Sequence, residues 1–111
     1  EMKVSLIGRS DGIHKLYETI KTISATKGAT IVTAIDGEFS DKVFMVAKKL
    51  KVPVLKYSND PQMKNGRAEA VRKAISDTDC CILFSNVDDD FSKFAKTVCS
   101  LKDKPFEVIS P

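Results

Sequence analysis

Short apolar runs alternate with longer segments whose apolar residues recur at helical spacing, and this alternation limits the fold more than any other feature. The runs cover residues 3–8, 30–35, 53–57, 80–84 and 106–109. In the segments between them apolar residues return every three or four positions, as Ile13, Leu16 and Ile20 do. Strands and helices that alternate through short connections form parallel sheets with right-handed crossovers. The sequence therefore predicts an α/β fold, a Rossmann-like three-layer sandwich with a five-stranded parallel sheet and about four helices. Periodicity leaves the strand order open.

Length and charge limit the classes of protein to which this chain can belong. A chain of 111 residues suits a single domain over 1–111. Its 18 basic and 15 acidic residues are scattered, so a nucleic-acid surface is not expected. No apolar stretch approaches the ~20 residues of a membrane helix, and nothing resembles a signal peptide. A cytoplasmic protein without membrane contact is expected.

The run 80–84 is the most continuously apolar one. It predicts a central strand that is covered on both faces. Cys80 and Cys81 are adjacent in it, so their side chains should point to opposite faces of the sheet. Together with Cys99 they are interpreted as reduced, buried, structural cysteines.

The first candidate site follows the first run. Gly8, Arg9 and Ser10 lie where a parallel sheet binds ligands, at the carboxyl end of a strand that leads into a helix. The Arg9 guanidinium suits a carboxylate or a phosphate. The alternative is an ordinary strand-to-helix turn with a solvated arginine.

A second candidate pair, Ser40 and Asp41, follows the second run. Asp41 could accept a hydrogen bond from a ribose hydroxyl or a base N–H. The structural alternative, which capping preferences favour, is that Ser40 caps the helix and Asp41 compensates its dipole.

A third set combines aromatic, amide and guanidinium groups after the third run: Tyr57, Asn65, Arg67 and Arg72. Tyr57 could stack on a base, and the arginines could pair with anionic groups. The alternative is a polar connecting loop. Ser85 and Asn86 end the most apolar run and should face the same crevice, unless they form only a turn and a helix cap.

Several of these junctions occur in the order of a known family. They are Gly8-Arg9-Ser10-Asp11, Ile35-Asp36-Gly37-Glu38-Phe39-Ser40-Asp41, Gly66-Arg67-Ala68 and Asp77-Thr78-Asp79 before the fourth run. In this order the chain resembles the small YspA-like members of the SLOG superfamily, which are Rossmann-like nucleotide-sensing proteins. The resemblance implies a nucleotide-derived ligand and adds Asp36 to the candidate residues.

The chain departs from this family after the fourth run. Where members carry a Gly-Gly-Thr type phosphate loop, this sequence has Asn86-Val87-Asp88-Asp89-Asp90. Three carboxylates there would repel a phosphate. The glutamate of the related phosphoribohydrolases has no equivalent, so their hydrolytic activity is not expected here.

No catalytic residue, metal or cofactor is expected. His14 is the only histidine and has no partner at metal-ligand spacing, and Cys99 has no local base. Asp88, Asp89 and Asp90 are interpreted as an acidic helix start, although clustered carboxylates can hold Mg²⁺.

The sequence thus favours a small non-catalytic protein that binds a nucleotide or nucleotide-derived ligand, to sense or sequester it. One alternative is an N-glycoside-cleaving enzyme similar to nucleoside deoxyribosyltransferases, in which Asp11, Asp41 or Asp88 would be the nucleophile. Another is a protein-binding regulator with a vestigial crevice. Self-association into a homodimer or higher oligomer would supply groups that one chain lacks.

Overall fold

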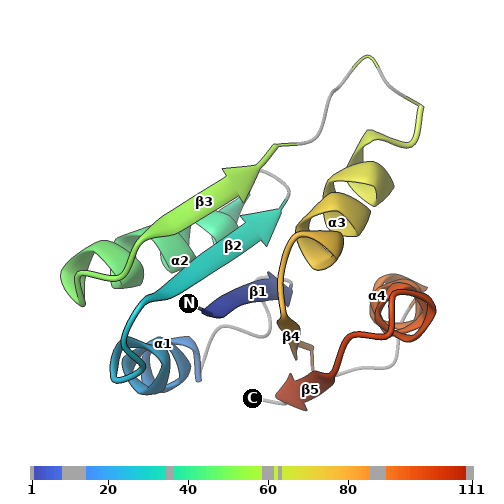
Figure 1. The fold of residues 1–111 in the computed structure, drawn as a ribbon. Coiled ribbons are helices and arrows are strands. Elements are labelled where there is room, and N and C mark those ends of the chain that lie inside the picture. Colours follow the sequence, from blue (N-terminus) through green and yellow to red (C-terminus); the bar gives the residue numbers. More distant parts are fainter. Residues whose placement is uncertain are drawn as a thin grey trace.

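The computed structural model describes residues 2–8, 15–34, 37–58, 62, 64–85 and 90–109 (Figure 1). Its elements are β1 (Met2–Gly8), α1 (Leu16–Ser24), β2 (Ala29–Ala34), α2 (Glu38–Lys49), β3 (Val54–Tyr57), α3 (Gly66–Ser76), β4 (Cys80–Phe84), α4 (Asp90–Leu101) and β5 (Phe106–Ile109). The strands form one parallel sheet in the order β3-β2-β1-β4-β5. The predicted Rossmann-like α/β fold is confirmed.

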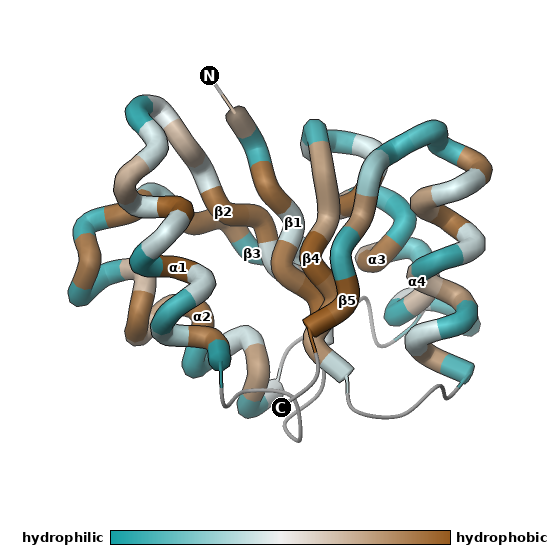
Figure 2. Tube along the Cα trace, turned by 90° about the horizontal axis from the view of Figure 1, so that it is seen from below, coloured by the Kyte–Doolittle hydropathy of each residue, from teal (hydrophilic) through white to brown (hydrophobic). Residues whose placement is uncertain are grey.

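The helices lie in two pairs on opposite faces of the sheet (Figure 2). We call these the α1–α2 face and the α3–α4 face. Leu6 and Ile31 point to the α1–α2 face, where they pack with Val43 of α2. Ile7 and Val32 point to the α3–α4 face. Both faces of β1 are therefore buried, as expected for the middle strand of a parallel sheet.

The start of α2 differs from the prediction. The helix begins at Glu38, and Gly37 is its N-cap. The expectation that Ser40 caps this helix is therefore wrong, because Ser40 lies inside the first turn and is buried. Gly37 adopts a φ of 152° and a ψ of −172°, a combination that is open essentially to glycine alone.

The covering of β4 also differs from the prediction. Cys81 and Leu83 point to the α3–α4 face and are 1% and 2% exposed. Cys80 and Ile82 point to the α1–α2 face and are only half-buried. The strand is internal to the sheet, but the expectations of full cover on both faces and of a buried Cys80 are wrong.

Polar groups connect β1 to the segment before β4. The main-chain N–H of Lys3 donates to Asp79 Oδ2 at 2.8 Å, and the N–H of Asp79 donates to the Lys3 carbonyl at 2.8 Å. Deeper in the core, Thr78 Oγ1 donates to Ser5 Oγ at 3.1 Å, and both residues are buried. These bonds fix the register between two strands that are far apart in the sequence.

Within the part of the chain that the structure describes, no helix has the length and apolar character required to cross a membrane.

Candidate functional site at the carboxyl edge of the sheet

The strand order changes direction between β1 and β4. From β1 the chain runs through α1 to β2 on one side, and from β4 it runs through α4 to β5 on the other. The crossover helices consequently leave on opposite faces of the sheet (Figure 2), and open parallel sheets bind ligands at the carboxyl ends of the strands on either side of such a point. Gly8 and Phe84 are register partners at these two ends.

An aromatic pair lies beside the end of β1 at this edge of the sheet. The rings of Phe39 and Phe84 lie 5.5 Å apart between their centroids at an angle of 48°, and both residues are buried. A β-carbon on Gly8 would lie 2.7 Å from the Phe84 carbonyl oxygen and 2.9 Å from Cε1 of Phe39. The space next to Gly8 is therefore filled by protein.

The first turn of α2 carries Phe39 and lies at the same edge of the sheet. The hydroxyl of Ser40 donates to the Ala34 carbonyl at 3.3 Å and lies 3.4 Å from Thr33 Oγ1. Asp41 and Glu38 are exposed acidic residues of the same turn. A β-carbon on Gly37 would meet no atom within 4 Å, so the turn begins beside open space. Ser40 thus ties the helix to the end of β2, while Asp41 remains accessible.

Tyr57, at the end of β3, contacts α3 and the residue after it. Its hydroxyl donates to Asp77 Oδ2 at 2.7 Å, and Lys73 Nζ lies 5.3 Å from its ring centroid. The hydrogen bond to Asp77 raises the pKa of the Tyr57 hydroxyl above its usual range. Partial burial and the charge of Asp77 act in the same direction.

The arginines of the third candidate set do not join Tyr57. Arg72 pairs with Glu69 on α3 and lies 5.5 Å from the ring centroid of Phe94 on α4. Asn65 is the N-cap of α3, and Arg67 is exposed in its first turn. In the structure Tyr57 and Arg72 therefore have different neighbours.

Four predicted residues lie outside the described residues: Arg9, Ser10, Asp36 and Asn86. In the sequence they follow β1, β2 and β4, three of the five parallel strands that end at this edge. Ser85 is described. It is buried directly after β4, and its N–H donates to the Ile109 carbonyl of β5 at 3.2 Å.

Sequence reasoning missed the pairing of Phe39 with Phe84, although the sequence contains a signal that Phe39 is buried. Phe39, Val43 and Ala47 are spaced four residues apart, so the inner stripe of α2 extends upstream of Ser40. All three are buried in the structure.

At the amino edge of the sheet a hollow of about 390 Å³ lies between the ends of α1 and α2. Lys27 and Lys51 line it. Helix C-termini carry negative partial charge, which disfavours anions there and is compensated by lysines. The carboxyl edge is therefore the better candidate for an anionic ligand.

No group of three or more His, Cys, Asp or Glu side chains that could hold a metal ion occurs among the described residues.

No protein-family model and no curated protein matches the chain. Solved structures with the same fold include saccharopine dehydrogenase (L-Glu forming) from Saccharomyces cerevisiae, with a TM-score of 0.66 and 14% identity. Anabaena HepE, solved in complex with UDP and glucose, has a TM-score of 0.61 and 13% identity. DNA processing protein A from Helicobacter pylori, which binds single-stranded DNA, has a TM-score of 0.62 and 18% identity.

These structures match 97%, 97% and 96% of this chain, which spans 21%, 29% and 64% of theirs. The chain thus corresponds to a part of each of these proteins. At such identities the likeness concerns the Rossmann-like fold alone.

Proposed function

We propose that this domain binds a nucleotide or nucleotide-derived small molecule at the carboxyl edge of the sheet, without converting it. The observation that carries the proposal is the reversal of the strand order between the parallel strands β1 and β4, with Gly8 at the end of β1. Open α/β sheets bind ligands in the crevice at such a point. The resemblance of the junctions to SLOG proteins supports the same ligand class.

The charges at this edge suit the two ends of a nucleotide. Glu38 and Asp41 stand at the start of α2, and Asp36 precedes them in the sequence. Carboxylates accept hydrogen bonds from sugar hydroxyls and repel phosphate, so we assign the ribose to the β2–α2 side. Arg9 follows β1 and is our candidate for the phosphate.

Binding without conversion is supported by the hydroxyl of Ser40, the residue after Phe39. Ser40 is buried and donates to the Ala34 carbonyl, which suits a structural role better than a nucleophilic one. An N-glycoside-cleaving enzyme would instead need Asp11, Asp41 or Asp88 as its nucleophile, and of these three the structure describes Asp41, which is exposed. Release of free base from a nucleoside during long incubation would establish that alternative.

The test is thermal unfolding of the full chain with nucleosides, mononucleotides, dinucleotides, cyclic nucleotides and ADP-ribose derivatives. A ligand at about a hundred times its Kd adds ~2.7 kcal/mol to the free energy of unfolding. We expect one of these compounds to raise Tm, and Arg9→Ala and Asp41→Asn to reduce the increase. Lys27→Ala, at the amino edge, is the matched control and should retain it.

Tyr57→Phe adds a separate measurement. It keeps the ring that could stack on a base and removes the hydrogen bond to Asp77. A ligand-induced Tm increase that survives Tyr57→Phe but not Tyr57→Ala would place the base near the ring. No increase with any compound would reject the proposal and favour a protein-binding regulator.

A further inference from the structure

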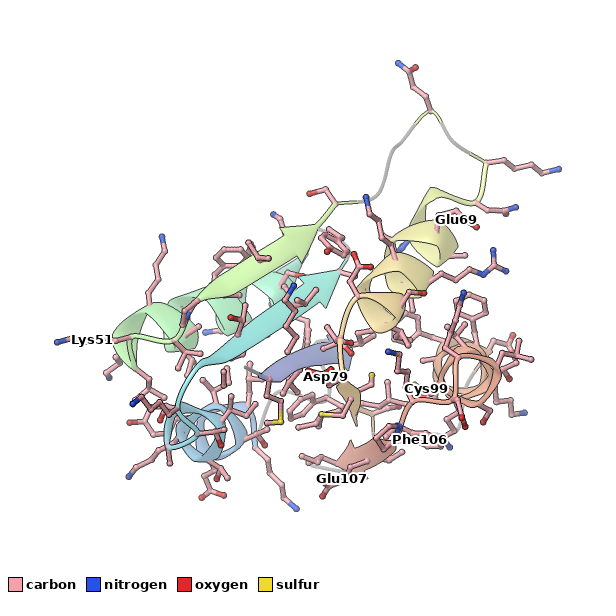
Figure 3. All side chains as sticks on the ribbon, in the orientation of Figure 1. Lys51, Glu69, Asp79, Cys99, Phe106 and Glu107 are labelled. Atoms are coloured by element: carbon pink, nitrogen blue, oxygen red, sulfur yellow. The ribbon has the colours of Figure 1, made fainter. Side chains whose placement is uncertain are left out.

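Two buried cysteines lie between β4 and α4. Cys81 is on the α3–α4 face of β4, Cys99 is in the last turn of α4, and both belong to the core on that side of the sheet. Figure 3 shows Cys99 on the side of α4 that faces the sheet. The two residues are 1% and 0% exposed, and both carry free thiols. The proposed nucleotide site does not use this pair.

Main-chain hydrogen bonds hold the two cysteines close to each other. The N–H of Cys81 donates to the Pro105 carbonyl at 3.1 Å, and the N–H of Lys104 donates to the Cys99 carbonyl at 2.8 Å. Lys104 and Pro105 are consecutive, so one dipeptide is hydrogen-bonded to both cysteines. The segment after α4 therefore fixes the end of this helix against β4.

The side chains of the two cysteines are also in contact. The thiols of Cys81 and Cys99 are hydrogen-bonded to each other. Ser5, the register partner of Cys81 on β1, contacts the same thiol through its hydroxyl. Ser5 is held in turn by Thr78, whose Oγ1 donates to the Ser5 hydroxyl at 3.1 Å. The Cys81 sulfur thus has a hydroxyl as its polar neighbour on the β1 side and a thiol on the α4 side.

The shared hydrogen bond makes the two thiols chemically unequal. It lowers the pKa of Cys99, whose thiolate accepts the bond, and raises the pKa of Cys81, which donates it. Burial opposes the first effect and adds to the second. The thiolate is the form of cysteine that reacts as a nucleophile. Cys99 is therefore the better nucleophile of the pair.

We propose that Cys81 and Cys99 are a reversible oxidation site, at which hydrogen peroxide produces a disulfide between β4 and α4. The Cys99 thiolate attacks one peroxide oxygen, so that an S–O bond forms, the O–O bond breaks and hydroxide leaves with the proton that Cys99 had released. The Cys81 sulfur then attacks the Cys99 sulfur. The S–S bond forms, the S–O bond breaks, and the hydroxyl group leaves as water with the proton of Cys81. Two thiols lose two electrons, and the peroxide becomes two waters.

The oxidant reaches the buried pair by local opening of β5. This edge strand has four residues, of which Phe106, Glu107 and Val108 are exposed, and among the described strands it pairs with β4 alone. Elements with few buried contacts open most readily. Pro105, which is bonded to Cys81, directly precedes the strand, so its release with β5 uncovers the pair. The site is independent of the nucleotide proposal, and the two succeed or fail separately.

The test treats the reduced full chain with hydrogen peroxide. Remaining thiols are blocked with N-ethylmaleimide in denaturant, and tandem mass spectrometry locates the disulfide. Cys80 is the internal control, because its loop to Cys99 differs by one residue from that of Cys81, whereas its side chain points to the α1–α2 face. We expect an excess of Cys81–Cys99 over Cys80–Cys99 disulfide of about tenfold or more in the folded protein. In urea the two disulfides should form in similar amounts.

Two matched variants repeat the comparison. Cys80→Ser keeps the contacting pair and should form the disulfide as the unchanged protein does. Cys81→Ser leaves cysteines on opposite faces of the sheet and should form none while it is folded, as checked by circular dichroism. Dithiothreitol should restore the free thiols.

Similar amounts of both disulfides in the folded protein would overturn the proposal. So would free thiols at both Cys81 and Cys99 after the half-buried Cys80 has been oxidised. The comparison of folded and urea-unfolded protein uses the unchanged chain, so it decides the matter even if a serine variant does not fold.

Discussion

Gly8 and Phe84 meet so closely at the ends of β1 and β4 that a β-carbon on Gly8 would lie 2.7 Å from the β-carbon of Phe84. The Phe84 carbonyl oxygen would be equally near. The carbonyl oxygen of Phe84 belongs to the main chain, which cannot move aside as the end of a flexible side chain can. The absence of a side chain at position 8 is thus a condition for pairing these two strands up to their last residues.

We therefore expect Gly8→Ala to destabilise the protein by about 1–3 kcal/mol through overpacking. Chemical denaturation gives the free energy of unfolding. Phe39→Leu in the Gly8→Ala background serves as the control, because it removes the ring atom that lies 2.9 Å away but leaves the clash with Phe84. Full recovery of stability in that double variant would show that our account of the clash is wrong.

Lys51 follows α2 with a φ of 60°, a position where glycine is usual. The N–H of Val52 donates to the Ala47 carbonyl at 2.9 Å, which closes the end of the helix. Because side chains are disfavoured at this φ, Lys51→Gly should stabilise the protein by about 1 kcal/mol. Asp103, with a φ of 57° after α4, is the comparison. Aspartate tolerates this conformation better than lysine does, so Asp103→Gly should stabilise the protein by less than Lys51→Gly.

Thr78 and Ser5 lie in the core between β1 and the end of α3. Thr78 Oγ1 donates to Ser5 Oγ and is also within 3.0 and 3.1 Å of the Ala74 and Ile75 carbonyls. Thr78→Val should cost about 1–3 kcal/mol because it leaves buried acceptors without this donor. In a double-mutant cycle with Ser5→Ala, the two costs should sum to more than that of the double variant. Simple additivity would mean that the hydroxyl–hydroxyl bond contributes nothing.

The Tyr57 hydroxyl should titrate above its ordinary pKa of about 10, because Asp77 accepts its proton in a hydrogen bond. In the Tyr17→Phe background, Tyr57 is the only tyrosine and its ultraviolet absorbance can be followed with pH. Asp77→Asn should lower the midpoint, since the carboxylate both accepts the bond and repels the phenolate.

The same shift sets the pH dependence of stability. A pKa raised in the folded state means that the contribution of Tyr57 is fully present below about pH 10 and is lost as pH rises through the folded pKa. The stability difference between the protein and Tyr57→Phe should accordingly shrink in that alkaline range. A constant difference would contradict this assignment.

The sequence was sufficient to predict the helices and strands, but not which strands pair or which side chains meet. Periodicity located β5 at residues 106–109 and four amphipathic helices, because burial on one face leaves a regular spacing. It could not order the strands, since the pairing of Val4 with Cys80 has no local signature. It also grouped Tyr57 with Arg72, whose neighbours in the fold are different. Lys73 rather than Arg72 lies over Tyr57, because consecutive helical residues point about 100° apart.

For β4 the limits of the pattern have a clear cause. Five consecutive apolar residues show that both faces of the strand suit burial. They do not show that this chain supplies both covers. Cys80 and Ile82 are apolar and yet only half-buried, because the described residues cover their face of the strand incompletely.

The two hydrogen bonds between Lys3 and Asp79 join residues that are 76 positions apart in the sequence. This separation affects the order in which parts of the sheet can form. On a ribosome β1 emerges long before β4, so one side of the middle strand has no hydrogen-bonding partner while α1 through α3 are being made. Contacts of such long sequence separation slow folding. Synthesis of β4 is therefore the moment at which the sheet can close around β1, and a pause before residue 80 would prolong the time during which the edge of β1 is open to aggregation.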